Sequence, residues 1–181
     1  MAAGLRAQNN LNLENWQSIT GTESPTDWVT YNSFKDFSLT DSASVKKAKP
    51  AYSGQFAAKI RPVLIDFGFQ YWLPGTMYQM YASTAKPKSF RFAYKYASTV
   101  SGDPALAAVY FYKGGTADTN NIVGQAIVWL NPSSSYTYVN KEITWNNANT
   151  PDTGYISFNT GPMDTASLLT IDDVSLSSFS A

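Results

Sequence analysis

The stretch LLTIDDVSL, Leu168 to Leu176, has the apolar and β-branched residues of a β-strand, yet it places two aspartates side by side. Successive strand residues point to opposite faces, so one of Asp172 and Asp173 is expected to point into the protein. An unpaired buried carboxylate is costly, and it needs a neutralising partner there. A metal ion can supply the charge; alternatively, one aspartate occupies a β-bulge and accepts backbone N–H groups or a lysine.

Segments rich in Val, Ile, Tyr, Phe and Thr recur along the chain, separated by clusters of Gly, Pro, Asn, Asp and Ser. No long stretch keeps a helical period. The expected strands lie at 28–40, 52–61, 89–98, 105–113, 121–130, 135–145, 154–160 and 167–176. The sequence therefore predicts an all-β fold, a two-sheet antiparallel β-sandwich of the jelly-roll type.

Composition excludes several classes of function. The 13 basic and 13 acidic residues cancel, whereas nucleic acids and anionic membranes attract concentrated positive charge. There is no cysteine and no histidine, which removes disulfides, thiol catalysis, the common zinc sites and the usual general base. No apolar stretch is long enough for a membrane helix, so no membrane insertion is expected.

The two ends of the chain differ in character. Residues 1–9 contain small residues and the cleavage-like LRAQ, and we interpret them as a signal-peptide remnant or a disordered tail. Residues 10–181 are expected to form a single domain. Together with the absence of cysteine, this favours an exported bacterial protein, secreted or at the cell surface.

Alternation assigns Phe90, Phe92, Val109 and Phe111 to the core, and the outward positions of the expected strands combine aromatic rings with amide, guanidinium and carboxylate groups. If these strands are neighbours, one face carries Arg91, Lys95, Tyr110, Tyr112, Gln125, Trp129, Tyr138, Asn140 and Glu142. A sugar stacks its C–H face on an aromatic ring and bonds its hydroxyls to such polar groups. We therefore predict a site for a polysaccharide or oligosaccharide.

Two other readings of these residues stay open. Tyrosine is common in strands and often packs in a core, so any one ring can be structural. The same outward rings can also contact a neighbouring domain of a larger secreted protein, in a structural or interaction role. A continuous apolar patch would favour that role, whereas rings interleaved with polar groups favour a sugar.

Catalysis is not expected. A glycosidase needs two carboxylates that converge across a cleft. Of the three glutamates, Glu142 alone falls on an exposed sheet position, and most aspartates lie in turns. No GxSxG motif, phosphate loop or histidine cluster is present.

The order of several motifs resembles one family. The chain opens with NLNLENW at Asn10 to Trp16 and closes with SLLTIDDVSL, and AYSGQFAAKI, KPKSFRFAYKY, YVNKEITWNN and TPDTGYISFN follow one another between them. This run resembles the calcium-binding jelly-roll carbohydrate-binding modules with a galactose-binding-like fold. It looks most like the carbohydrate-metabolism domains of bacterial secreted proteins, although TAS stands before the last strand where that family has GS.

The resemblance implies a structural calcium where the first and last strands meet. It implies Glu14 and one of Asp172 and Asp173 as ligands, with Asp173 favoured, and backbone carbonyls from YSG or KKAKP completing the shell. It also implies a non-catalytic role in binding polysaccharide.

Overall fold

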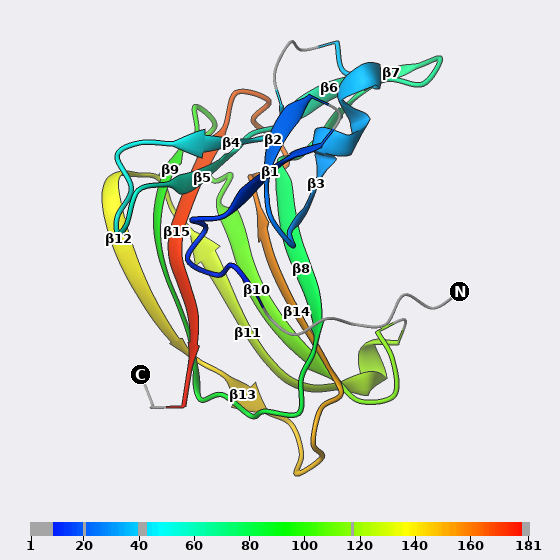
Figure 1. Ribbon diagram of the computed structural model, residues 1–181, viewed down its shortest axis with the longest axis vertical. Coiled ribbons are helices and arrows are strands. Elements are labelled where there is room, and N and C mark those ends of the chain that lie inside the picture. The colour runs from blue at the N-terminus through cyan, green and yellow to red at the C-terminus, as the bar shows by residue number, and fades with distance from the viewer. Residues whose placement is uncertain (1–8, 20, 40–42, 117, 179–181) are drawn as a thin grey trace.

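The computed structural model describes residues 9–19, 21–39, 43–116 and 118–178 of the 181-residue chain. Nearly all of its regular structure is β-strand (Figure 1). The strands are β1 (Trp16–Ile19), β2 (Thr22–Pro25), β3 (Val29–Thr30), β4 (Val45–Ala48), β5 (Ala57–Ile60), β6 (Val63–Asp66), β7 (Gln70–Leu73), β8 (Thr76–Ala82), β9 (Ser89–Ala97), β10 (Ala105–Tyr112), β11 (Ile122–Leu130), β12 (Ser133–Glu142), β13 (Thr144–Trp145), β14 (Thr153–Asn159) and β15 (Leu168–Ser177). Two short 3-10 helices, η1 (Tyr31–Phe37) and η2 (Thr119–Asn121), complete the described elements.

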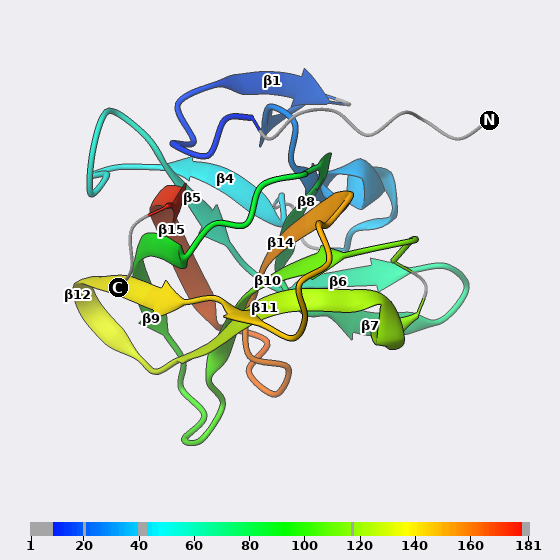
Figure 2. The same ribbon diagram turned by 90° about the horizontal axis from the view of Figure 1, so that it is seen from below.

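Two main sheets form the sandwich, and every described pairing in them is antiparallel. One sheet has six strands in the order β13-β11-β10-β14-β8-β3, and the other has five in the order β12-β9-β15-β5-β4. Two separate hairpins, β1-β2 and β6-β7, flank them. The two main layers face each other in both views (Figures 1 and 2). The predicted all-β, two-sheet antiparallel sandwich is confirmed.

The core lies between the two layers. Alternation in β9 turns Phe90 and Phe92 inward, where both are fully buried. Their ring centroids lie 5.9 and 5.3 Å from that of Phe158, which belongs to β14 in the opposite sheet. The expected inward positions Val109 and Phe111 of β10 are also fully buried, so the face assignments within these strands are confirmed.

Two expected strands are shorter than predicted. At 28–40, the strand β3 ends at Thr30 and the 3-10 helix η1 follows, because Tyr31, Phe34 and Phe37 recur every three residues, and this helix packs against β6. At 52–61, β5 begins at Ala57, and the preceding residues form a turn around Gly54, whose φ is 62°.

The ends of the chain are described only in part. Residues 1–8, predicted to be a signal remnant or tail, lie outside the described residues. Asn9 is already bonded to the six-stranded sheet, since its backbone N–H donates to Gln79 Oε1 at 3.2 Å. Among the described elements, neither of the two helices is long and apolar enough to cross a membrane.

Candidate functional site

The outer face of the six-stranded sheet presents a field of tyrosines. The strand register places Tyr110 directly opposite Gln125 on one side and Tyr155 on the other. Ring centroids lie 6.4 Å apart for Tyr110 and Tyr155, and 5.5 Å apart for Tyr78 and Tyr155. We call this surface the tyrosine face, and it comprises Tyr78, Met80, Tyr110, Tyr112, Gln125, Ile127, Trp129 and Tyr155.

The tyrosine face is accessible. Trp129 is 64% exposed at one end of it, and Ile127 and Met80 are 37% and 39% exposed. The tyrosines are half-buried against one another, which fixes their rings while leaving part of each ring exposed. Rings held this way lose little conformational freedom when a flat ligand stacks on them.

Two of its hydroxyl groups, those of Tyr112 and Tyr155, have a raised pKa and stay protonated over a wide pH range. Burial raises the pKa of Tyr155, and the nearby hydroxyls of Tyr78 and Tyr112 raise it further. Burial also raises the pKa of Tyr112, with Tyr110 adding to the effect. Neutral phenols both donate and accept hydrogen bonds, as sugar hydroxyls do.

The six strands beneath this face are uncharged. Within the described ranges of β3, β8, β10, β11, β13 and β14 there is no Asp, Glu, Lys or Arg. The face therefore offers no carboxylate pair of the kind that glycoside hydrolysis requires. It can stack and form hydrogen bonds, and it suits a neutral ligand.

Two projections flank the tyrosine face. The β6-β7 hairpin and the loop that carries η2 both extend from the six-stranded sheet on the side away from the five-stranded sheet (Figures 1 and 2). The hairpin tip carries Phe69, which is 69% exposed, and Trp72 on β7 is 43% exposed. Aromatic side chains are therefore available beyond the sheet itself.

The predicted sugar-binding residues divide between two faces. Tyr110, Tyr112, Gln125 and Trp129 lie together on the tyrosine face, as their strands β10 and β11 are neighbours. Arg91, Lys95, Tyr138, Asn140 and Glu142 lie on the outer face of the five-stranded sheet, on β9 and β12. The prediction of one shared face was wrong, because alternation distinguishes outward from inward but not one sheet from the other.

The group on the five-stranded sheet is tied into local contacts. Arg91 Nε donates to Asn140 Oδ1 at 3.0 Å, and the ring of Tyr138 stacks on that of Tyr52 with centroids 6.3 Å apart. Lys95 Nζ lies 4.2 Å from the centroid of the Tyr136 ring. Four of the five residues therefore already contact other side chains of the protein, and Arg91 and Lys95 are partly buried.

A polar corner forms where the segment just before β1 and the last strand, β15, approach the turn at 52–56. Asp172 Oδ2 accepts the backbone N–H groups of Tyr52 and Ser53 at 2.6 and 2.8 Å. Glu14 Oε1 accepts those of Gln55 and Phe56 at 2.9 and 3.2 Å. The two carboxylates thus hold successive residues of one turn.

Neither adjacent aspartate points into the core, contrary to the expectation from alternation. A register shift between Asp172 and Ser175 marks a β-bulge, and Asp173 has a φ of 51°. Asp172 points to the outer face, opposite Ala93, where the turn covers it completely. Burial raises the pKa of Asp172, although three backbone N–H bonds, one of them from Asp173 at 2.7 Å, oppose this shift.

These contacts bear on the predicted calcium. Calcium takes six to eight oxygen ligands, whereas both oxygens of Asp172 and Oε1 of Glu14 face N–H donors. Within the described residues, no group of three or more acidic side chains gathers as a metal site. The residues as arranged do not fit an ion held by these oxygens. Calcium at this corner, with Asp173 as a ligand, stays a prediction.

Sequence reasoning missed two rings of the tyrosine face. Tyr155 lies in the expected strand at 154–160, but that strand was not assigned a face. Tyr78 lies in β8, whose alternation of Thr76, Tyr78 and Met80 with buried Met77 and Tyr81 was available but was not used. Both rings could have been found from this period-two pattern.

Comparison with known proteins supports the fold. No family model matches the chain, and no curated protein matches it in sequence. A proposed glycoside hydrolase from Bacteroides thetaiotaomicron is similar in structure, with a TM-score of 0.70 and 14% identity, over 94% of this chain and 71% of that one.

Two smaller proteins align along almost their whole length. The carbohydrate-binding module TmCBM61, solved with β-1,4-galactotriose, has a TM-score of 0.52 and 14% identity over 97% of this chain and 99% of that one. A Stig cyclase from Fischerella has a TM-score of 0.54 and 10% identity over 96% of each chain. At such low identities the likeness establishes a sandwich shared by binding modules and enzymes, and it leaves function to the site.

Proposed function

We propose that this chain is a non-catalytic carbohydrate-binding module that holds a neutral polysaccharide on the tyrosine face. The observation that carries the proposal is the uncharged row of rings, with Tyr110 and Tyr155 side by side and Trp129 64% exposed beyond them. A sugar chain lying across the strands would stack on successive rings and bond to their hydroxyls and to Gln125.

The absence of charge on the described strands supports binding over hydrolysis. A charged side chain left without a partner under a neutral ligand would lose its hydration, whereas phenols and amides match sugar hydroxyls. Binding without chemistry would serve to keep a larger protein on its polysaccharide. We include in the proposal that the protein is secreted or at the cell surface, and that other domains accompany it.

Affinity electrophoresis and calorimetry with neutral galactan, xylan, mannan and glucan test the proposal. Trp129→Ala and Tyr110→Ala are each expected to weaken binding about tenfold, because an aromatic anchor contributes roughly 1–2 kcal/mol. Tyr138→Ala is the matched control, since Tyr138 is 47% exposed on the opposite sheet.

The outcomes separate clearly. Loss in the first two variants with an unchanged control supports the tyrosine face. Binding that none of these substitutions alters, or no binding to any neutral polysaccharide, contradicts it.

The second candidate is a structural or interaction domain. The observation that favours it is the aromatic tip of the β6-β7 hairpin, where Phe67 and Phe69 are 43% and 69% exposed. Exposed rings in such a cluster are typical of a contact surface. Self-association of the wild-type chain in sedimentation experiments, together with no detectable binding to any glycan, would favour this candidate.

A further inference from the structure

Three lysines share one row across the outer face of the five-stranded sheet. Lys46 of β4 lies opposite Lys59 of β5, Lys59 lies opposite Thr170 of β15, and Thr170 lies opposite Lys95 of β9. We call these four residues the lysine row. Adjacent strands are about 5 Å apart, so the row places three positive charges within a span of roughly 15 Å.

The row carries an electrostatic cost that the protein itself does not offset. Like charges directly opposite each other on neighbouring strands are destabilising. Among the described residues, no ion pair joins Lys46, Lys59 or Lys95 to a carboxylate. Asp172 lies two residues beyond Thr170 on the same face, but it is fully buried and already accepts three backbone N–H groups.

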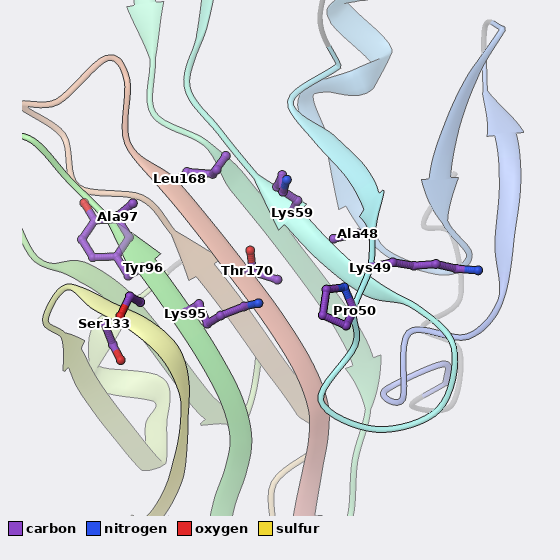
Figure 3. Close-up of a pocket in the computed structure, with 11 residues that line it drawn as sticks. Ala48, Lys49, Pro50, Lys59, Lys95, Tyr96, Ala97, Ser133, Leu168 and Thr170 are labelled. Carbon is purple, nitrogen blue, oxygen red and sulfur yellow. The ribbon is translucent and has the colours of Figure 1, made fainter.

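A cavity of about 210 Å³ opens over Lys59, Thr170 and Lys95, the three residues of the row that line it. Its lining residues are Ala48, Lys49, Pro50, Lys59, Lys95, Tyr96, Ala97, Ser133, Ser134, Leu168 and Thr170. Thr170 lies between Lys59 and Lys95, whereas the side chain of Lys49 points away from it (Figure 3). No acidic residue lines the cavity.

The polar groups of the cavity match an anion. Thr170 is 6% exposed, and its hydroxyl has no hydrogen-bond partner among the described residues. The hydroxyl can donate to an oxyanion placed over it, while Lys59 and Lys95 approach from the neighbouring strands. The ring of Tyr136, 4.2 Å from Lys95 Nζ, restrains that ammonium at the rim.

We propose that this cavity binds an anionic group, a carboxylate or a sulfate, of an acidic polysaccharide. The volume holds roughly seven water molecules, so it admits one ring-sized group and not a long segment of chain. A uronate or sulfated residue would enter while the rest of its chain ran along the surface. The inference rests on the proposed function only in choosing a polysaccharide to carry the anion.

Nucleic acid is disfavoured as the occupant. Nucleic-acid sites neutralise many phosphates at once, and the chain as a whole has 13 basic and 13 acidic residues. Short single-stranded DNA is therefore included in the test as a competing polyanion.

The test measures binding of polygalacturonate and of its fully methyl-esterified form, and of dextran sulfate and dextran, at low salt. Each pair keeps the sugar and changes its charge. The wild type is expected to bind at least one charged member and to bind its neutral partner about tenfold more weakly, with affinity falling as salt rises. Preference for polygalacturonate would identify a carboxylate, and preference for dextran sulfate a sulfate.

Variants locate the site. Lys59→Gln combined with Lys95→Gln is expected to weaken binding of the charged polymer about tenfold. The control combines Lys88→Gln with Lys141→Gln. It removes the same charge from two exposed positions away from the cavity, one just before β9 and one near the end of β12. Melting temperature separates binding from folding: relief of the Lys46–Lys59 repulsion should leave it unchanged or slightly raised.

Three outcomes would overturn the inference: equal losses in the two double variants, no binding to either charged polymer, or tighter binding to single-stranded DNA. Trp129→Ala should leave binding of the charged polymer intact and weaken the neutral one, while the Lys59 and Lys95 variant should do the reverse. The failure of either proposal is therefore distinguishable from the failure of the other.

Discussion

The two outer faces of the sandwich have opposite chemistry. The described strands beneath the tyrosine face contain no charged residue, whereas those of the five-stranded sheet carry Lys46, Lys47, Lys59, Arg91, Lys95, Lys141, Glu142, Asp172 and Asp173. On the five-stranded sheet, several of these groups hold the protein's own backbone and side chains. On the tyrosine face, the rings mainly touch one another.

The difference separates stability from binding. Asp172 is fully buried and bonds to the turn at 52–56, so that turn depends on it. Trp129 projects from the sheet and is 64% exposed, so folding depends on it little. Substitutions on the two faces should therefore have different signatures.

The largest effect on stability is expected from Asp172→Ala. The substitution leaves three backbone N–H groups without their acceptor, and it should lower the free energy of unfolding by about 3 kcal/mol. Trp129→Ala should change it by less than about 0.5 kcal/mol. Urea unfolding followed by fluorescence and circular dichroism measures both.

The same unfolding curves, recorded with calcium and with a chelator, test the calcium prediction. Equal stability in both conditions would fit carboxylates that serve only the backbone. A calcium-dependent gain that Glu14→Gln abolishes would show that the corner binds the ion and that its N–H contacts rearrange.

A smaller loss is expected from Gly54→Ala. Gly54 has a φ of 62°, and a Cβ there would collide with the Glu14 carboxylate that holds the turn. We expect a loss of about 2 kcal/mol, from backbone strain and from the displaced carboxylate.

Gly102→Ala is the matched control for Gly54. Its φ is 77°, but a Cβ there would have nothing within 4 Å. Backbone strain alone should cost about 1 kcal/mol. Equal losses at the two positions would mean that Glu14 contributes nothing to the turn.

The smallest effect concerns pH on the tyrosine face. Burial raises the pKa of Tyr112 and Tyr155, so both stay protonated below their ordinary value of about 10, and the chain has no histidine. Binding of a neutral polysaccharide should change less than about twofold between pH 5 and 9, and it should weaken only as pH rises through those raised pKa values. Calorimetry across this range measures it.

The lysine row provides the contrast. Its ligand must be ionised, so binding of polygalacturonate should be lost as pH falls through the ordinary carboxyl range near about 4. If the affinity for a neutral glycan also fell as pH dropped toward about 4, the two faces would not differ in the charge of the ligand they bind.

The fold was predictable because alternation and turn residues are local signals. Phe90, Phe92, Val109 and Phe111 were assigned correctly to the core, and Trp129 to the surface. The helix η1 was missed because Val29, Thr30 and Tyr31 at its start favour a strand, although Tyr31, Phe34 and Phe37 recur every three residues, the period of a 3-10 helix. The local pattern therefore contained the signal, and counting its period separates this helix from a strand.

The site was predicted in part. The outward residues of one strand can be recognised from the local sequence, but which strands lie side by side cannot. Tyr110, Tyr112, Gln125 and Trp129 were grouped correctly because their strands are consecutive in the sequence. Arg91 and Asn140 were grouped with them wrongly, because strand order in each sheet depends on long-range pairing. The lysine row was not found for the same reason: Lys46 and Lys59 come from consecutive strands, but Lys95 and Thr170 join them only through the long-range pairing of β9 and β15.

The bulge at Asp172 and Asp173 changes the phase of the last strand. Before it, Thr170 and Asp172 point outward with Ile171 inward; after it, Ser175 faces outward opposite Arg91, and Val174 returns to the core. The strand is thus two period-two signals offset by one residue, and no single alternation fits all of it. The paired aspartates mark the position of this change. An alternation pattern fitted to β15 must therefore be shifted by one residue at Asp173, so that both Ile171 and Val174 are assigned to the core.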